Sequence, residues 1–522
     1  MQDPEFPQGA PQLAQASNPR LPACIFPRPH YYGGVAASSP ETPLSNTIDA
    51  SNTTADTPPL GSAPPSEFTD SARSRGGLLK VLGVWFGIAA AVGNTIAAGI
   101  VRAPGDIAQW LPNVYLFFGV WIVGGLYALV GASSMAELGA AIPRSGGQYN
   151  FSRRAIGDYA GFIVGWSDWL STCGTAAAVA IVIAEYSGSL FPTLSGHVQP
   201  IAVAVIVGFF ILQWRGIRWG KSTQLITAAM KTIAFVIVVA AGFLLGSRAH
   251  DAGIAATAAA ASSAAKPALR SGWPLAIAVT LALQAVLYSI DGWDGIVYFG
   301  EEVRNPGRDV PRAIFGSVFS IMGIYLLINA AVLYVLPLNQ IAGNNFSLGT
   351  AANHIFGHYG DPIIRSIMII SLLSCMNANQ LFCSRTLYAM SCDGLFFRRA
   401  AKVNAGGTPA FALFLSTLIG VAFVLFPFER VIAMLSFFFV ANYTLSYASL
   451  FVLRRKEPQM PRPYRAWGYP YTTTIALAGS ILFLIGSIAT DRDNAPLALF
   501  MLLASYPVYR AIKYAATRTA IS

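Results

Sequence analysis

The sequence predicts an all-helical integral membrane protein with twelve transmembrane helices, and three observations carry this prediction. The 522 residues are 54% hydrophobic and only 11% charged, whereas soluble domains carry about 25% charged residues. Apolar runs long enough to cross a bilayer recur after residue 76, and the loops between them alternate in charge. Two of these runs are interrupted by glycine and polar residues where an unbroken apolar helix is expected.

Each apolar run should form a helix, because lipid offers no hydrogen-bond partner to backbone groups. We expect helices near 78–109, 114–138, 157–187, 199–214, 221–246, 274–303, 312–336, 362–392, 409–426, 430–455, 469–489 and 496–515. The chain then divides into a tail, 1–76, and a twelve-helix domain, 77–522.

The tail has a different composition from the rest of the chain. It holds thirteen of the 32 prolines, is rich in Ser, Thr and Ala, and is acidic. It lacks a basic segment followed by an apolar one, so it does not resemble a signal peptide. We expect it to be disordered and cytoplasmic.

Basic residues are concentrated in alternate loops. With the N-terminus in the cytoplasm, cytoplasmic loops and flanks hold 23 Lys and Arg residues, and the outward side holds seven. This bias predicts a multi-pass protein of the cell membrane with both termini cytoplasmic. The net charge of +10 therefore belongs to loops and does not indicate nucleic-acid binding. Five cysteines without a CxxC pair argue against a disulfide framework or zinc cluster.

The two interrupted helices are the most informative feature. The first breaks at "GNTIAAG", 93–99, and the sixth at "SIDGWDG", 289–295. These positions correspond if the chain holds two inverted five-helix repeats, about 78–246 and 274–455, with two peripheral helices at 469–515. Paired breaks in matching halves indicate a transporter's binding site.

A broken helix exposes backbone groups that are useful for binding. Its first half ends in free carbonyls with partial negative charge, and its second half begins with free amides with partial positive charge. Here the carbonyls fall near 92–94 and 288–290, and the amides near 97–99. An α-amino acid carries an ammonium and a carboxylate on one carbon, so the breaks are a plausible receptor for it. A simple glycine kink is the alternative.

Several motifs resemble the amino acid–polyamine–organocation superfamily, especially L-type amino acid transporters and their bacterial homologues. The matching stretches are "GNTIAAGI", "AELGAAIPRSGGQYNF", "GFIVGWSDWL", "TQLITAAMKTIAF", "SIDGWDGIVYFGEEVRNPGRDVPRAI", "NANQLFCSRTLYAMSCDGLF" and "PYRAWGYP". The resemblance implies a twelve-helix inverted-repeat fold that exchanges or takes up amino acids by alternating access. The family's first break usually reads Gly-Ser-Gly where this chain has Ala97, Ala98 and Gly99, which leaves the accepted substrate shape open.

The resemblance also bears on a partner. Animal members join a single-span glycoprotein through a cysteine between the third and fourth helices, but this loop reads "GSLFPTLSGHV" here. We therefore expect no disulfide-linked heavy chain.

Lys231 lies deep within its predicted helix, on one face with Gln224 and Thr227. An ammonium at this depth should not face lipid, although a lysine that snorkels to the interface is the alternative. The resemblance implies that Lys231 occupies the place where sodium-coupled relatives hold sodium and bonds the carbonyls of the first break.

Two aspartates flank the second break, and two interpretations stay open. Asp291 could cap a half-helix, with Asp294 in its first turn. Alternatively, one of them receives a substrate ammonium or a proton. By resemblance Tyr288 is an aromatic gate, and Trp293 is a weaker candidate for that role, although either could simply pack in the core. Asn377 matches a substrate-side polar position, or makes an interhelical hydrogen bond.

The predicted substrate site combines the residues of both breaks with a polar residue from the eighth helix. It comprises Gly93, Asn94, Ile96, Ala97, Ala98, Gly99, Tyr288, Ser289, Ile290, Asp291, Trp293, Asp294 and Asn377, with Lys231 as the fixed cation.

We expect no cofactor and no metal, since "HIFGH" lacks the protease glutamate and no phosphate-binding or nucleophile motif occurs. Glu137, Arg385 and the pair Glu301–Glu302 should form ion pairs near cytoplasmic helix ends. The sequence favours a sodium-independent amino acid transporter, either an exchanger or proton-coupled. An amine or polyamine carrier, and a non-transporting receptor with the same fold, are the alternatives.

Overall fold

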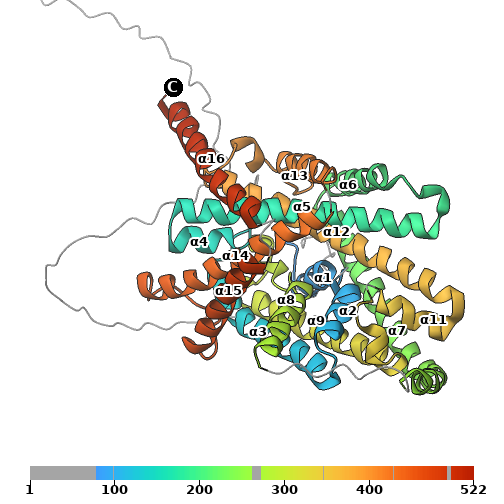
Figure 1. Cartoon of the computed structure of the whole chain (residues 1–522). Coiled ribbons are helices and arrows are strands. Elements are labelled where there is room, and N and C mark those ends of the chain that lie inside the picture. The colour runs from blue at the N-terminus through green and yellow to red at the C-terminus, as the bar shows by residue number, and fades with distance from the viewer. Residues whose placement is uncertain are drawn as a thin grey trace, which may run out of the picture.

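The computed structural model describes residues 78–97, 99–261, 272–344, 346–426, 428–490 and 495–521. The predicted tail 1–76 and the predicted site residue Ala98 lie outside these residues. The described part consists of helices and loops, with two isolated β-bridges (Figure 1). Its helices are α1 (Val84–Thr95), α2 (Gly99–Trp110), α3 (Val114–Ala141), α4 (Tyr149–Ala155), α5 (Asp158–Leu190), α6 (Val198–Trp214), α7 (Ile217–Ala261), α8 (Trp273–Ser289), α9 (Pro306–Val335), α10 (Leu338–Ile341), α11 (Ser347–Phe356), α12 (Gly360–Cys392), α13 (Ala410–Phe423), α14 (Phe428–Lys456), α15 (Tyr471–Thr490) and α16 (Ala495–Ile521).

Every apolar segment predicted from the sequence falls on a described helix, so the all-helical fold class is confirmed. Six described helices are individually long and apolar enough to cross a membrane, or seven if the bent pair α1 and α2 is one span. Four shorter apolar helices accompany them. The exact number of twelve spans stays a prediction.

The sixth predicted helix, 274–303, differs from its prediction. The α-helix α8 stops at Ser289, and the chain continues through turns into a 3₁₀ segment, Gly295–Tyr298. Gly292 has a φ of 100°, which a right-handed helix cannot include. Three short helices in loops, α4, α10 and α11, were not predicted from the sequence.

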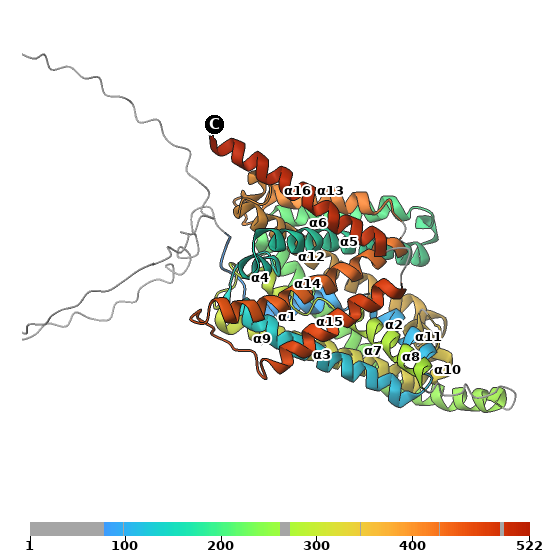
Figure 2. The same ribbon diagram turned by 60° about the vertical axis from the view of Figure 1, so that its left-hand side comes forward.

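The helices pack in matching pairs around the long helices α5 and α12. In Figures 1 and 2 α5 runs beside α12, and α3 lies beside α9. Helix α14 packs on α5 as α7 packs on α12, and α6 packs on α5 as α13 packs on α12. One buried apolar cluster joins α1, α2, α3, α8 and α9, and a second joins α5, α6, α12 and α13.

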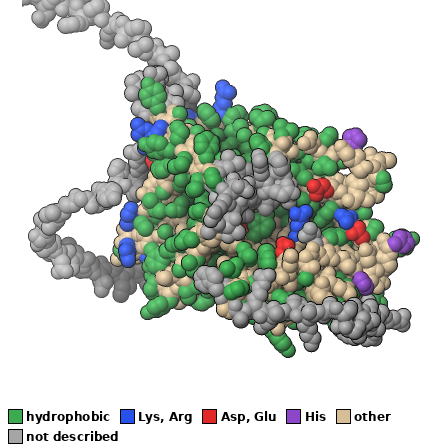
Figure 3. All heavy atoms as spheres, in the orientation of Figure 1, with side chains coloured by type: hydrophobic (Ala, Val, Ile, Leu, Met, Phe, Trp, Pro, Cys, Tyr) green, Lys and Arg blue, Asp and Glu red, His purple; other side chains and the backbone are tan. Residues whose placement is uncertain are grey.

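The outer surface fits a membrane environment. The middle of the face in Figure 3 is mostly hydrophobic, while Lys and Arg side chains gather towards its left end, where Figure 1 places α4. Large apolar side chains such as Ile233, Leu482 and Leu503 are exposed on α7, α15 and α16. An exposed apolar belt of this kind is stable in lipid rather than in water.

Candidate substrate site

The first helix break separates α1 from α2. Helix α1 ends at Thr95, α2 begins at Gly99, and the two axes are bent by 52°. A Cβ atom on Gly99 would lie 3.0 Å from the Cα of Ser289, the last residue of α8. A Cβ on Gly292 would lie 2.3 Å from Nδ2 of Asn94. The two breaks therefore touch each other, and glycine permits that close approach.

Lys231 of α7 binds the carbonyls at the end of α1. Its ammonium Nζ donates to the carbonyl oxygens of Val92 at 3.2 Å, Gly93 at 2.9 Å and Ile96 at 2.7 Å. The side chain is fully buried. It therefore does not snorkel to the interface, and its contacts are those that the sequence analysis anticipated. Three carbonyl acceptors satisfy the three donors of an ammonium group.

The remaining carbonyls of this break also accept hydrogen bonds from side chains. Cys375 Sγ of α12 lies 3.1 Å from the Asn94 carbonyl, and Ser371 Oγ lies 2.5 Å from that of Ile96. The Tyr325 hydroxyl of α9 lies 3.0 Å from the Thr95 carbonyl and 2.9 Å from the Ser289 carbonyl. The protein's own donors thus occupy the α1 carbonyls near 92–94, which the sequence predicts to bind a substrate ammonium, and the Ser289 carbonyl of the second break.

Tyr325 joins the two breaks through a single hydroxyl group. It is fully buried, so Tyr325→Phe would leave two carbonyls with one partner fewer in a dry environment. We expect this variant to lower the free energy of unfolding by about 1–3 kcal/mol and to weaken amino acid binding. Thermal unfolding of the purified protein measures the first effect. Tyr115→Phe, at a tyrosine of α3 that is 86% exposed, is the control, and equal stability of the two variants would contradict this role.

Within the described part of the chain, the backbone amides at the start of α2 are unpaired, unlike the carbonyls at the end of α1. Among the described residues, neither the Ala97 nor the Gly99 backbone N–H donates a hydrogen bond. Both residues line a cavity of about 250 Å³ between the two breaks. Unpaired amides at a helix start attract an anion through their N–H groups and the helix dipole.

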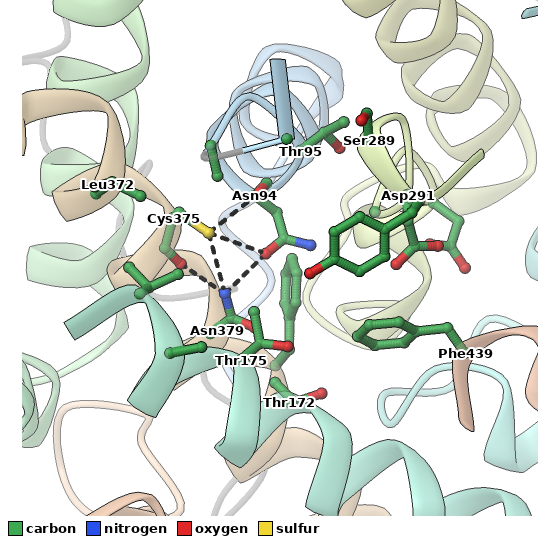
Figure 4. Close-up of a pocket in the computed structure, with 18 of the residues that line it drawn as sticks. Asn94, Thr95, Thr172, Thr175, Ser289, Asp291, Leu372, Cys375, Asn379 and Phe439 are labelled. Atoms are coloured by element: carbon green, nitrogen blue, oxygen red, sulfur yellow. Dashed lines mark hydrogen bonds between the residues drawn. The ribbon is translucent and has the colours of Figure 1, made fainter. Parts of the chain in front are cut away.

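The cavity is lined by residues of six helices and the turn after α8. Figure 4 shows Asn94 facing Cys375 and Asn379 of α12 on one side, with Asp291 and Phe439 on the other. Asn379 Nδ2 donates to Asn94 Oδ1 at 2.9 Å and so holds that side chain in place. The lining also includes Thr95, Ala97, Gly99, Arg102, Asp106, Gln148, Asp168, Thr172, Thr175, Tyr288, Ser289, Asp294, Tyr298, Phe382, Asn442 and Tyr443.

The structure brings together only part of the predicted site. Asn94, Ala97, Gly99, Tyr288, Ser289, Asp291 and Asp294 all line the cavity. Gly93, Ile96, Ile290, Trp293 and Asn377 do not.

The predicted residues that do not line the cavity pack next to those that do. Gly93 faces α7, because a Cβ there would lie 1.8 Å from Nε2 of Gln224. Ile96 contributes only its carbonyl. Ile290 and Trp293 line a smaller cavity of about 60 Å³, which shares Tyr288 and Asp291 with the first. Trp293 stacks on Tyr443 with ring centroids 5.6 Å apart.

The prediction for Asn377 as a substrate-side residue is corrected. Its Nδ2 donates to the Gly220 carbonyl at 3.0 Å and to Gln224 Oε1 at 2.7 Å, both on α7. The polar residue of α12 at the cavity is Asn379. Two residues along an α-helix turn a side chain by about 200°, so Asn377 and Asn379 face opposite sides.

Asp294 binds neutral donors rather than capping a helix. Gln148 Nε2 donates to its Oδ2 at 3.0 Å, and the Tyr443 hydroxyl donates to its Oδ1 at 3.1 Å. No side-chain capping bond forms at the start of the 3₁₀ segment that follows. Asp294 therefore does not cap the 3₁₀ segment that follows it, and the interpretation of Asp291 as a helix cap stays a prediction.

Sequence reasoning missed Asp168, which lies at the cavity on α5. The Tyr298 hydroxyl donates to its Oδ1 at 2.7 Å, and the Thr386 hydroxyl to its Oδ2 at 3.1 Å. A signal was present, because a carboxylate inside an apolar helix is rare and usually functional. Tyr325 carried no comparable signal, since tyrosine is common in membrane helices.

The cavity reaches the surface at one end and is closed at the other. Arg102, which lines it, is exposed. At the closed end Tyr298 and Phe382 stack with ring centroids 4.6 Å apart. Beyond them, the buried Arg385 pairs with Glu302, its Nε 2.8 Å from Oε1. Arg454 and Arg462 likewise pair with Glu137. Arg385 thus ties α12 to the chain after α8, and Glu137 ties the end of α3 to the last turn of α14 and to the chain that follows it.

A membrane fold with two touching helix breaks, beside a cavity whose wall includes polar and charged side chains, is the architecture of a secondary transporter. The sequence comparisons agree. The model of the amino acid permease family matches residues 79–512, and the chain therefore belongs to this family, within the amino acid–polyamine–organocation superfamily. The family and its relatives are transporters, not enzymes.

Three relatives illustrate the similarity. The serine/threonine exchanger SteT of Bacillus subtilis is 26% identical over 84% of this chain and 98% of its own length. The mouse large neutral amino acids transporter small subunit 2 is 26% identical over 88% of this chain and 86% of its own. The mouse Asc-type amino acid transporter 1 is 25% identical over 84% of this chain and 82% of its own.

Proposed function

We propose that the protein is a sodium-independent secondary transporter of amino acids that works by alternating access, as an exchanger or with proton coupling. It binds the α-carboxylate and the α-amino group of its substrate where α1, α2 and α8 are interrupted. Family membership and the amino acid transporters among its relatives support transport of this substrate class. In this proposal it lies in the cell membrane with both termini in the cytoplasm.

The α-carboxylate lies at the start of α2. The Ala97 and Gly99 amides have no partner among the described residues and line the cavity, and the positive end of the helix dipole favours an anion there. The α-ammonium lies at the end of α8 beside Asp291, because the carbonyls of α1 already accept bonds from Lys231 and its neighbours.

The contacts of Lys231 are the main support for sodium-independent transport. The Lys231 ammonium donates to three carbonyl oxygens and supplies the positive charge that a bound sodium ion would otherwise supply to them. A fixed cation cannot dissociate with each transport cycle. Transport therefore has no sodium ion to couple to at this position.

The matching helix pairs support an inverted five-plus-five repeat with α15 and α16 at the periphery. The pairs α5–α14 and α12–α7 are equivalent in such a repeat, as are α5–α6 and α12–α13. Tyr288 acts as the gate in this scheme, since it lines both cavities beside the breaks. The loop between α5 and α6 contains no cysteine, and we propose that the protein works without a disulfide-linked heavy chain.

Uptake of radiolabelled amino acids into proteoliposomes tests the proposed function. We expect uptake above that of protein-free vesicles, and the same rate when choline replaces sodium. Binding without uptake would identify a receptor instead. Uptake of amines without competition by any amino acid would identify an amine carrier.

A further inference from the structure

The charge of the cavity wall is the starting point for identifying the substrate. Five charged side chains line the cavity, namely Arg102, Asp106, Asp168, Asp291 and Asp294. Four of the five are carboxylates. Arg102 and Asp106 lie one turn apart on α2 near the open end, so the interior beyond them carries three carboxylates.

None of these three carboxylates forms an ion pair with a described residue. The side chains that hydrogen-bond Asp168 and Asp294 are an amide and three hydroxyls, all uncharged. Such donors orient a carboxyl group but supply no positive charge to it. Burying an unpaired carboxylate is costly, and a ligand that supplied a positive charge would remove that cost.

Independent evidence for a polar ligand comes from two other residues of the wall. Thr95 Oγ1 and Asn442 Nδ2 are buried and have no hydrogen-bond partner among the described residues. Both residues line the cavity, with exposed fractions of 5% and 2%. Native proteins rarely leave such groups unpaired, so the cavity is built for a ligand with hydrogen-bonding groups.

We propose that the substrate is an amino acid with a cationic side chain, and that Asp294 and Asp168 form the subsite for that charge. This inference rests on the proposed function, which places the α-carboxylate at the start of α2 and the α-ammonium beside Asp291. The side chain then extends towards the closed end of the cavity, where Gln148 and Tyr298 hold the two carboxylates. A guanidinium or ammonium there replaces the missing positive charge.

The test compares L-arginine with L-citrulline, which has nearly the same shape but a neutral ureido group. Binding to the purified full-length protein is measured by titration calorimetry. We expect arginine to bind at least about 10-fold more tightly than citrulline, since hydrogen bonds to charged groups contribute more than neutral ones. Equal or tighter binding of citrulline would overturn the inference and indicate that the carboxylates carry protons.

The variant Asp294→Asn removes the charge and keeps the shape. We expect it to weaken arginine binding by about 10- to 100-fold and to change citrulline binding by less than about threefold. Asp168→Asn should act in the same direction and serves as a second test if Asp294→Asn does not fold. Asp361→Asn is the matched control, because Asp361 pairs with Arg365 and does not line the cavity. Equal loss of both ligands in the two cavity variants would overturn the subsite.

A third ligand separates this inference from the proposed function. Agmatine carries the guanidinium of arginine but lacks the carboxylate. If agmatine binds as tightly as arginine, the protein recognises an amine and the proposed amino acid function fails, while the cationic subsite stands. If neutral amino acids bind and arginine does not, the proposed function stands and the subsite fails.

Discussion

Lys231→Ala is expected to reach the membrane and lose most of its transport activity. The substitution removes the donor to three carbonyls in a site without exposure to solvent. Leaving a buried acceptor unpaired costs about 1–3 kcal/mol. The interruption between α1 and α2 should then relax from the shape that presents the Ala97 and Gly99 amides.

Two further variants test whether transport requires a lysine at position 231. Lys231→Arg should rescue transport poorly, because a planar fork cannot meet three converging carbonyls as a compact ammonium does. Lys221→Ala is the matched control: it removes a lysine of the same helix that donates to the Val81 carbonyl at 3.0 Å but is only partly buried. Uptake into proteoliposomes measures all three. Normal flux in Lys231→Ala, or a wild type that requires sodium, would refute the role of the fixed cation.

Arg385→Met should be the most destabilising of the variants considered. Arg385 and Glu302 are 1% and 0% exposed and form an ion pair with two hydrogen bonds, of 2.8 and 3.2 Å. Breaking such a buried pair costs about 3–5 kcal/mol, because the remaining charge has no partner, whereas replacing both partners by apolar residues is often neutral. We therefore expect Arg385→Met combined with Glu302→Leu to recover much of the lost stability.

Thermal unfolding of the purified variants measures this effect. Arg365→Met is the control, because its ion pair with Asp361 is partly exposed and should contribute only about 0–1 kcal/mol. A double variant that is less stable than Arg385→Met alone would contradict the assignment of the loss to an unpaired charge. The stable double variant can then be tested for transport, since this pair lies at the closed end of the cavity.

The features that the sequence predicted well are those that lipid makes costly. A membrane interior penalises unpaired backbone and charge. The interruption at 93–99 and the buried Lys231 therefore both pointed to a site, and the structure places them in contact. The helical segments followed from the same physics.

The site residues that could not be predicted depend on how each helix is rotated about its axis and on contacts between helices. Asn377 and Asn379 are equivalent in sequence pattern, and only the packing of α12 decides which one faces the cavity. Tyr325 resembles any tyrosine of an apolar helix until α9 places it between the two breaks. The conformation after α8 depends on Gly292, which packs against Asn94 of α1. This contact joins two helices that are far apart in the sequence.

We expect the interrupted helices to recognise the carboxylate and the ammonium of an amino acid together. A thermal-shift screen of the purified protein against the twenty amino acids measures this, with each amino acid compared with its methyl ester, which lacks the carboxylate charge, and its N-acetyl derivative, which lacks the ammonium. At least one amino acid should stabilise the protein, and its ester and N-acetyl derivative should not. Equal stabilisation by the ester or by the N-acetyl derivative would show that the site does not recognise both groups.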